Sequence, residues 1–311
     1  RLGWVFGLLC AISIQGEAQE EAGWSKRDSV MVAEIHGHVL GSGQCYEDLR
    51  VLCKDIGARL SGSDEADDAI LWGGQTLSSI GVGAVRMQPV VVPHWQRGET
   101  EKAWMRVDGG APEPLRISAL GGSIGTDGPL EAEVAIFKNF DALDSLGAEG
   151  VAGKMVFFNR PMDPLMINAG SAYGGAYEQR SKGAVEAAAH GGVGALVRSL
   201  THALDTFPHT GGMRYDDEVR KVPSAAVSTV DARRIAQLLK DGREVRVGMD
   251  MGCALFDDKS QANVIAEWKG TEFPDRYIVV GGHLDSWDIG EGAHDDGALA
   301  EAVEHGPALY E

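Results

Sequence analysis

Apolar residues along this chain recur with two different spacings, which predict helices in some segments and strands in others. Within residues 44–57 they return every three or four positions, and Gly57 stands where such a helix would end. A second helix is expected after a short loop, with Ser63 or Asp64 as its N-cap and further acidic residues in its first turn, where the helix dipole favours negative charge. The first part of the chain is therefore predicted to contain two helices in succession.

Shorter apolar runs, many of them alternating with polar residues, fill the middle of the chain and predict strands. Residues 84–95 predict one strand, and Pro89 and Pro93 indicate an edge or a broken strand, because proline cannot donate to a sheet ladder. From about residue 118 onward we predict strands at 131–140, 153–160, 194–200, 222–228 and 243–252 and helices at 181–192 and 229–242. This pattern indicates a compact β-rich module with small helices.

Strands resume after this module, at residues 260–270 and 275–286, and the second contains an apolar run from Tyr277 to Val280 that is typical of a buried strand. Strands and helices on both sides of a module predict an α/β protein, with a mixed sheet flanked by helices and an inserted β-rich domain. The expected divisions are a leader at 1–18, the first part of the α/β domain at 19–117, the insert at 118–257 and the start of the metal-binding core at 258–311.

The first eighteen residues predict a secretory signal peptide. One arginine precedes an uncharged and mainly apolar run from Leu2 to Ile14, and Gly16 and Ala18 follow with the spacing of a cleavage site. The run is too short to span a bilayer, so we expect no membrane span. A buried N-terminal element and, less favoured, a lipid anchor on Cys10 are the alternatives. A signal peptide would place the protein outside the cytoplasm, secreted or periplasmic.

Composition and charge exclude some classes of partner. The chain has 311 residues, of which 44% are hydrophobic and 24% charged, as is ordinary for a globular protein of two domains. Its net charge of −18 disfavours binding to nucleic acid or to an anionic membrane surface. After the leader Cys45, Cys53 and Cys253 remain, and the first two would lie about 12 Å apart on one helix, too far for a disulfide bond. We expect all three to be buried thiols.

The first candidate metal ligands lie at the end of the second of the late strands, where ligand sites of α/β sheets gather. His283 offers a ring nitrogen that suits zinc, and Asp295 offers a carboxylate that can bridge two cations. Asp285 can hold the other ring nitrogen of His283, as carboxylates near metal centres commonly do. Each residue alone also fits an ordinary packed histidine or a turn, and we expect Asp288 and His294 to be loop residues. The combination with a glycine-rich loop favours a metal site.

The stretch GGHLDSWDIGEGAHDDG, residues 281–297, resembles the dinuclear zinc exopeptidases of peptidase family M28. Segments in order over about residues 40–298 resemble a carboxypeptidase branch of that family, which makes the resemblance more specific than one short motif. These segments are IGARLSGS at 56–63, PVVVPHWQRGE at 89–99, LGGSIGT at 120–126, KGAVEAAAHGGVGALVRS at 182–199, FPHTGGMRY at 207–215 and VPSAAVSTVDARRI at 222–235.

The resemblance implies a fold, an activity and roles for individual residues. The insert would be a protease-associated-type domain over the active-site cleft, and two zinc ions would activate the water molecule that attacks the peptide bond. His283 would bind one zinc, Asp295 would bridge both, and Asp285 would serve catalysis by orienting His283. The Asp295–Asp296 peptide bond would be cis. Peptides or dipeptides would be cleaved at their ends, and family members often form homodimers.

The resemblance also implies a Glu–Glu pair, a further acidic ligand and a final histidine after the Asp–Asp pair. The chain contains no Glu–Glu pair there, and Gly306 and Pro307 interrupt the helix that the family pattern continues with. We therefore expect a C-terminally truncated metallopeptidase that carries part of the metal-ligand set, binds zinc weakly, is poorly soluble and does not cleave peptides by itself. The alternatives are an inactive fragment and a non-catalytic binding protein that retains the protease-associated-type domain.

Overall fold

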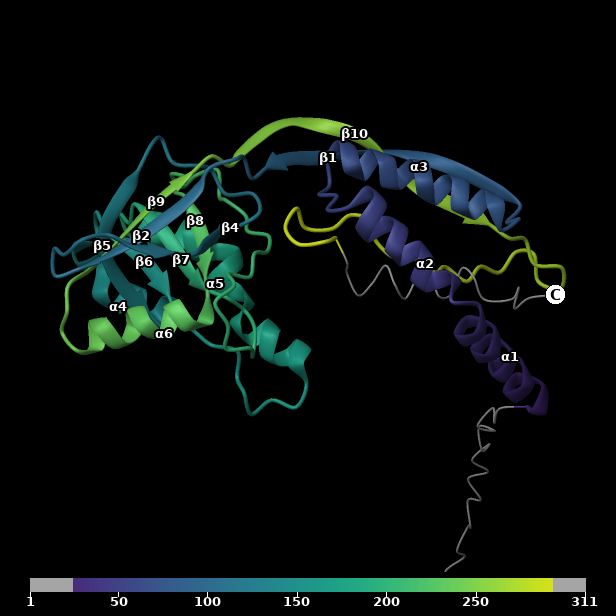
Figure 1. The fold of residues 1–311 in the computed structure, drawn as a ribbon, viewed down its shortest axis with the longest axis horizontal. Helices are drawn as coiled ribbons and strands as arrows, with labels where there is room; N and C mark the ends of the chain where they lie inside the picture. Colours follow the sequence, from purple (N-terminus) through teal and green to yellow (C-terminus); the bar gives the residue numbers. More distant parts are fainter. Residues whose placement is uncertain (1–24, 293–311) are drawn as a thin grey trace, which may run out of the picture.

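The computed structural model describes residues 25–292 of the chain (Figure 1). The expected signal peptide at 1–18, the expected ligand Asp295 and the expected cis bond Asp295–Asp296 lie outside these residues. Among the described helices, none is long and apolar enough to cross a membrane.

The helices are α1 (Lys26–Ser42), α2 (Gln44–Arg50), α3 (Asp64–Ser79), α4 (Phe140–Val151), α5 (Ala169–Ala189) and α6 (Thr229–Lys240), with a wider π-helical turn η1 (Val51–Ile56). The strands are β1 (Ala84–Gln96), β2 (Glu101–Val107), β3 (Glu113–Leu115), β4 (Ile117–Ala119), β5 (Leu130–Phe137), β6 (Met155–Phe158), β7 (Gly194–Arg198), β8 (Ser224–Val227), β9 (Val245–Met251) and β10 (Ala254–Glu267).

Eight of the strands form one mixed sheet, in the order β3-β2-β9-β5-β6-β7-β8-β4. The strands from β5 to β8 are parallel, and the pairs on either side of them are antiparallel. We call this sheet and the helices that cover it, residues 97–253, the body. The prediction of an α/β fold with a mixed sheet flanked by helices is confirmed.

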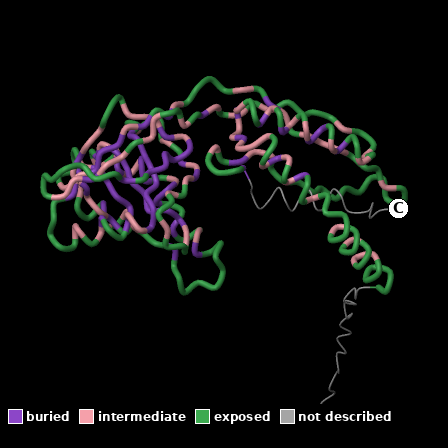
Figure 2. The backbone as a smooth tube through the Cα atoms, viewed as in Figure 1, coloured by how far each residue is buried: buried purple, intermediate pink, exposed green. Residues whose placement is uncertain are grey.

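Alternation of side chains along the central strands builds a hydrophobic core on each face of this sheet. Met155 and Phe157 of β6 join one core together with Ile235 of α6, whereas Val156 and Phe158 join the other core with residues of α4 and α5. All residues of β6 are buried, as expected for a strand that is covered on both faces. Figure 2 shows that the buried residues of the protein are concentrated in the body.

Two long neighbouring strands connect the body to the rest of the chain. β1 and β10 pair antiparallel and run side by side away from the body, and α3 lies along them (Figure 1). We call residues 25–96 and 254–292 the arm. α3 approaches the strands closely because a Cβ on Gly74 would lie only 2.5 Å from the Cε atom of Met87. The register of β1 shifts between Val92 and His94, which confirms the prediction of a broken strand.

The two helices predicted in the first part of the chain are present in the arm. Residues 44–56 form α2 and η1, and Gly57 ends them with a φ of 90°, a conformation that glycine adopts without strain. The side chain of Ser63 caps α3 by accepting from the backbone N–H of Ala66. α1 was not predicted, because its sequence lacks a clear apolar face and none of its residues is buried.

The structure corrects the prediction of a strand at residues 275–286. This segment is not a strand, and Ile278 and Val279 are 70% and 90% exposed. A strand needs a hydrogen-bonded neighbour, and within residues 25–292 no strand pairs with this segment.

The sheet and one helix of the body extend beyond their predicted ranges. The sheet of the body begins before residue 118, because β2 pairs with both β3 and β9. The helix expected at 181–192 starts twelve residues earlier, where Asn168 caps it by accepting from Ser171 N. The strand pairings join residues that periodicity does not connect, whereas the cap at Asn168 is a local signal that the prediction missed.

Candidate metal centre

His283 and Asp285 lie on the segment that follows β10, and their side chains face each other. Nδ1 of His283 lies 3.1 Å from Oδ1 of Asp285 and 2.8 Å from the backbone oxygen of the same residue. Both oxygens are acceptors, so Nδ1 carries the proton and the neutral ring has its lone pair on Nε2. Histidines that bind zinc commonly donate their other N–H in this way, so the described donor atoms fit a zinc site.

The buried side chain of Arg59 connects this segment to the other half of the arm, residues 25–96. The side chain of Arg59 is fully buried, and its guanidinium donates to three carbonyl oxygens, including that of Leu284. The backbone N–H of Arg59 donates to Oγ of Ser286 over 3.1 Å, and Ser286 N–H donates to the carbonyl of Arg59 over 3.0 Å. Asp285 therefore lies between two residues that Arg59 holds in place.

Arg97 fastens the same segment to the body. Its Nε and Nη2 atoms each lie 2.8 Å from one carboxylate oxygen of Asp288, which makes a bidentate ion pair. Nη1 of Arg97 donates to Glu101 and to the carbonyl of Ala119 in the body. Burial opposes the charge of Arg97, but the carboxylates of Asp288 and Glu101 outweigh it and raise the pKa of the guanidinium above its ordinary value.

Trp287, between these two attachments, packs on Gly121 of the body. Two atoms of the indole ring lie 2.4 Å from the position that a Cβ on Gly121 would occupy, so only glycine leaves room for the ring. No motif in the sequence indicated a role for Arg59 or Arg97. The available signal was weak: each arginine lies within a segment that carries the family resemblance, at 56–63 and 89–99.

The three cysteines of the described residues lie in different environments. Cys253 is buried, and burial raises the pKa of its thiol to about 11. Cys45 and Cys53 are only partly buried and do not form a disulfide bond. The expectation of buried thiols is therefore correct for Cys253 and wrong for the other two.

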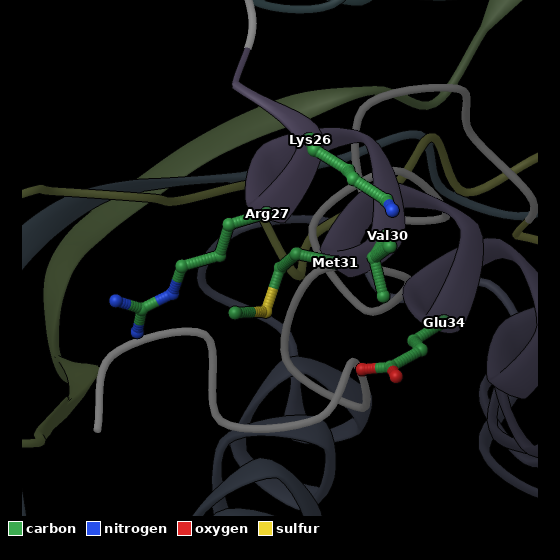
Figure 3. A pocket seen from close by; sticks show the side chains of 5 residues that line it. All are labelled: Lys26, Arg27, Val30, Met31 and Glu34. Carbon is green, nitrogen blue, oxygen red and sulfur yellow. The ribbon is translucent and has the colours of Figure 1, made fainter.

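A hollow beside α1 takes no part in the arrangement around His283. Its lining consists of Lys26, Arg27, Val30, Met31 and Glu34, which all belong to one helix (Figure 3). Binding sites are usually concave regions in which a few polar groups from different elements converge. The side chains of a single exposed helix do not meet this condition, and we assign no function to the hollow.

Comparison with known proteins gives one consistent family. The model of peptidase family M28 matches residues 263–303, a stretch that contains His283 and Asp285. The chain is 35% identical over 275 residues to carboxypeptidase Q from Xenopus laevis, across 88% of this chain and 55% of that protein. The chain thus spans about half the length of the curated relatives it matches.

Solved structures agree with the sequence comparison. The crystal structure of a peptidase M28 precursor from Shewanella amazonensis superimposes with a TM-score of 0.82 at 36% identity, across 89% of this chain and 62% of that chain. A zinc aminopeptidase from Bacillus subtilis superimposes with a TM-score of 0.54 at 18% identity, across 84% of this chain and 57% of that chain. At that identity the second similarity shows the fold alone.

Proposed function

This chain is a homologue of the family M28 peptidases, and from that premise we propose that it forms part of a zinc-dependent exopeptidase. His283 would hold zinc through Nε2, Asp285 would orient the imidazole ring, and Asp295 would serve as the ligand shared by two metal ions. The observation that carries the proposal is the contact between His283 Nδ1 and Asp285, which lies inside the segment that matches the family.

In the proposed reaction, the described residues of this chain orient the imidazole ring of His283. Asp285 accepts a hydrogen bond from the Nδ1–H group of His283, which places the lone pair of the neutral ring on Nε2. Arg59 holds the backbone on both sides of Asp285, and Arg97 pairs with the side chain of Asp288, so the segment that carries the ring and the carboxylate is attached at both points. Zinc bound there would polarise the scissile carbonyl and lower the pKa of a water molecule. The carboxylate of Asp295 has two oxygens and can contact two cations.

The proposed substrate is a peptide or dipeptide that is cleaved at one end. Support comes from the relative at 35% identity, which is named as a carboxypeptidase. The body would border the substrate cleft as a protease-associated-type insert, because Arg97 and Gly121 of the body contact Asp288 and Trp287. Export through residues 1–18 and assembly as a homodimer belong to the same proposal.

Zinc binding tests the proposed ligands independently of hydrolysis. Equilibrium dialysis of the purified chain against zinc would compare the parent with His283→Ala, Asp285→Asn and the control His202→Gln, whose histidine lies on a surface turn of the body. We expect His283→Ala to remove at least one equivalent of bound zinc and Asp285→Asn to weaken binding by about 10- to 100-fold. Binding to His283→Ala that equals the parent's would contradict the assignment of His283 as a ligand.

Hydrolysis is then measured on dipeptides and on peptides blocked at either end, with zinc and with a chelator. We expect the complete exopeptidase, of which this chain would form part, to show cleavage that zinc restores after chelation and that one of the two blocking groups prevents, and the isolated chain to show none. Zinc binding through His283 without any hydrolysis by the complete protein would favour a binding protein over an enzyme. Cleavage that persists with the chelator would contradict the metallopeptidase proposal.

A further inference from the structure

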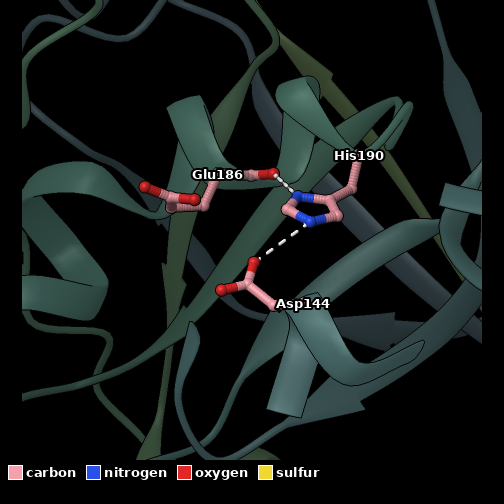
Figure 4. Close-up of side chains that lie close together, drawn as sticks. All are labelled: Asp144, Glu186 and His190. Atoms are coloured by element: carbon pink, nitrogen blue, oxygen red, sulfur yellow. Dashed lines mark hydrogen bonds and ion pairs between the residues drawn. The ribbon is translucent and has the colours of Figure 1, made fainter. Parts of the chain in front are cut away.

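The helices α4 and α5 bring a second set of metal-binding side chains together, within the body and apart from His283. Asp144 comes from α4, Glu186 comes from the last turns of α5, and His190 is the residue at the C-terminal cap of α5. One ligand atom from each lies within 4.8 Å of the other two. Within residues 25–292, this is the only such group of His, Cys, Asp and Glu side chains. Figure 4 shows the three side chains gathered where α5 ends.

The hydrogen bonds of His190 determine which of its nitrogens faces the acidic side chains. Nδ1 lies 2.9 Å from the backbone oxygen of Glu186, which accepts hydrogen bonds only, so Nδ1 carries the proton. In the neutral ring Nε2 then has a lone pair, and it lies 3.1 Å from Oδ1 of Asp144 (Figure 4). Two acceptors at this distance repel each other unless a positive charge, either a proton or a metal ion, lies between them.

The spacing of these atoms suits a metal ion. Ligand atoms about 2.0–2.1 Å from a tetrahedral zinc lie roughly 3.3 Å from one another, close to the separation between His190 and Asp144. A metal-bound histidine typically donates its other N–H to a carbonyl or carboxylate, and Nδ1 of His190 already does so. The partly exposed side chain of Glu186 lies one helical turn before His190, where it needs only a side-chain adjustment to become the third ligand.

The surrounding backbone holds the two helix ends together before any ion binds. Gly153 N–H, just after α4, donates to the carbonyl of Gly191, just after α5, over 2.9 Å. The C-terminal end of a helix also carries partial negative charge, which favours a cation near His190. The net charge of −18 acts in the same direction.

We propose that Asp144, Glu186 and His190 bind one divalent transition-metal ion of the zinc class, which links α4 to the C-terminal end of α5. One imidazole nitrogen and two carboxylate oxygens form a mixed donor set that zinc and its first-row neighbours accept. Water completes the coordination, because Asp144 is largely exposed. The role of this site is structural: it connects two helices that cover the same face of the sheet.

The body contains a matched control. Nε2 of His209 lies 3.3 Å from Oδ2 of Asp205, so this pair has nearly the same separation as His190 and Asp144. No third metal-binding side chain of the described residues joins it. A site that depends on three ligands should therefore respond to changes at His190 and not to changes at His209.

Zinc binding to the full chain tests the proposal. Equilibrium dialysis would compare the parent with His190→Gln, Asp144→Asn, His209→Gln and His283→Ala. We expect His190→Gln and Asp144→Asn each to remove one equivalent of zinc, or to weaken its binding by at least about tenfold. His209→Gln should bind as the parent does, and His283→Ala should retain this equivalent.

A second measurement keeps the test decisive if His190→Gln perturbs folding. Asp144 is exposed, so Asp144→Asn should retain the circular dichroism spectrum of the parent, and zinc should raise the thermal unfolding midpoint of the parent more than that of Asp144→Asn. Equal zinc binding and equal zinc-induced shifts in the parent and in both variants would overturn the proposal. A proton alone would then connect His190 and Asp144.

Discussion

Two apolar runs of four residues, one in the body and one in the arm, differ in burial. Residues 155–158, MVFF, form β6 and are completely buried. Residues 277–280, YIVV, form no strand and are exposed. The difference lies in the neighbours, because β6 has parallel partners on both edges and helices over both faces, whereas no described strand pairs with residues 277–280. Hydrophobicity alone therefore does not make a core strand; partners on both edges do.

The largest expected effect comes from truncating one apolar side chain in each run to alanine. Phe157→Ala should destabilise the body by about 3–5 kcal/mol, because it leaves a cavity in a closed core. Val279→Ala should change stability by less than about 0.5 kcal/mol, because the side chain is already exposed. Denaturant unfolding measures both values, and equal costs would break the comparison.

A second test uses Arg59 to ask whether the arm can lose local stability while the body keeps its own. Arg59→Met removes the donors to carbonyl groups in the arm, and each buried acceptor left without a partner costs about 1–3 kcal/mol. Hydrogen exchange should accelerate at residues 284–286 and stay unchanged in β6. Arg86→Met, at an exposed position of β1, serves as the control and should leave both regions unaffected. Faster exchange throughout β6 would show that the two regions unfold together.

A smaller effect is expected at the connection between the two regions. Arg97→Lys keeps the positive charge but loses the bidentate pair with Asp288, so we expect a local cost of about 1–2 kcal/mol. Exchange should accelerate near residues 287–289 while the denaturant midpoint of the body changes little. The exposed Arg116→Lys is the matched control. No change in exchange would show that Arg97 does not hold this segment.

The mildest test leaves the fold intact and compares thiols. The pKa of Cys253 is raised to about 11, so at pH 8 its thiolate is scarcer than that of an ordinary cysteine, and its reaction accelerates only as the pH approaches that value. Cys53 of the arm should react with iodoacetamide at pH 8, whereas Cys253 should react only after unfolding. Peptide mass spectrometry identifies the modified residues. Equal rates at Cys53 and Cys253 would contradict the difference in burial.

Local signals in the sequence predicted the parts of the fold that depend on near neighbours. The cap at Ser63, the stop at Gly57 and the helix α6 follow from side chains within a few residues of one another. The pairing of His283 with Asp285 is local in the same sense, since the two residues are separated by one position. The roles of Asp285, His283 and Asp295 at a metal centre remain predictions to be tested by the zinc measurements.

Contacts between distant residues could not be predicted in this way. Arg97 and Asp288 are 191 positions apart, and Arg59 and Ser286 are 227 apart. Asp144 and His190 meet only because α4 and α5 pack on the same face of the sheet. Periodicity describes which face of an element is apolar, but it contains no information about which element will cover that face.

The sequence by itself determined the resemblance to peptidase family M28, the α/β class and the candidate ligands, because each depends on short motifs and on local spacing. Only the tertiary structure decided which apolar runs are buried, which arginines hold the segment around His283, and that a second group of metal-binding side chains exists. The physical reason is that burial and ion pairing require partners, and the sheet order of the body and the antiparallel pairing of β1 with β10 determine those partners.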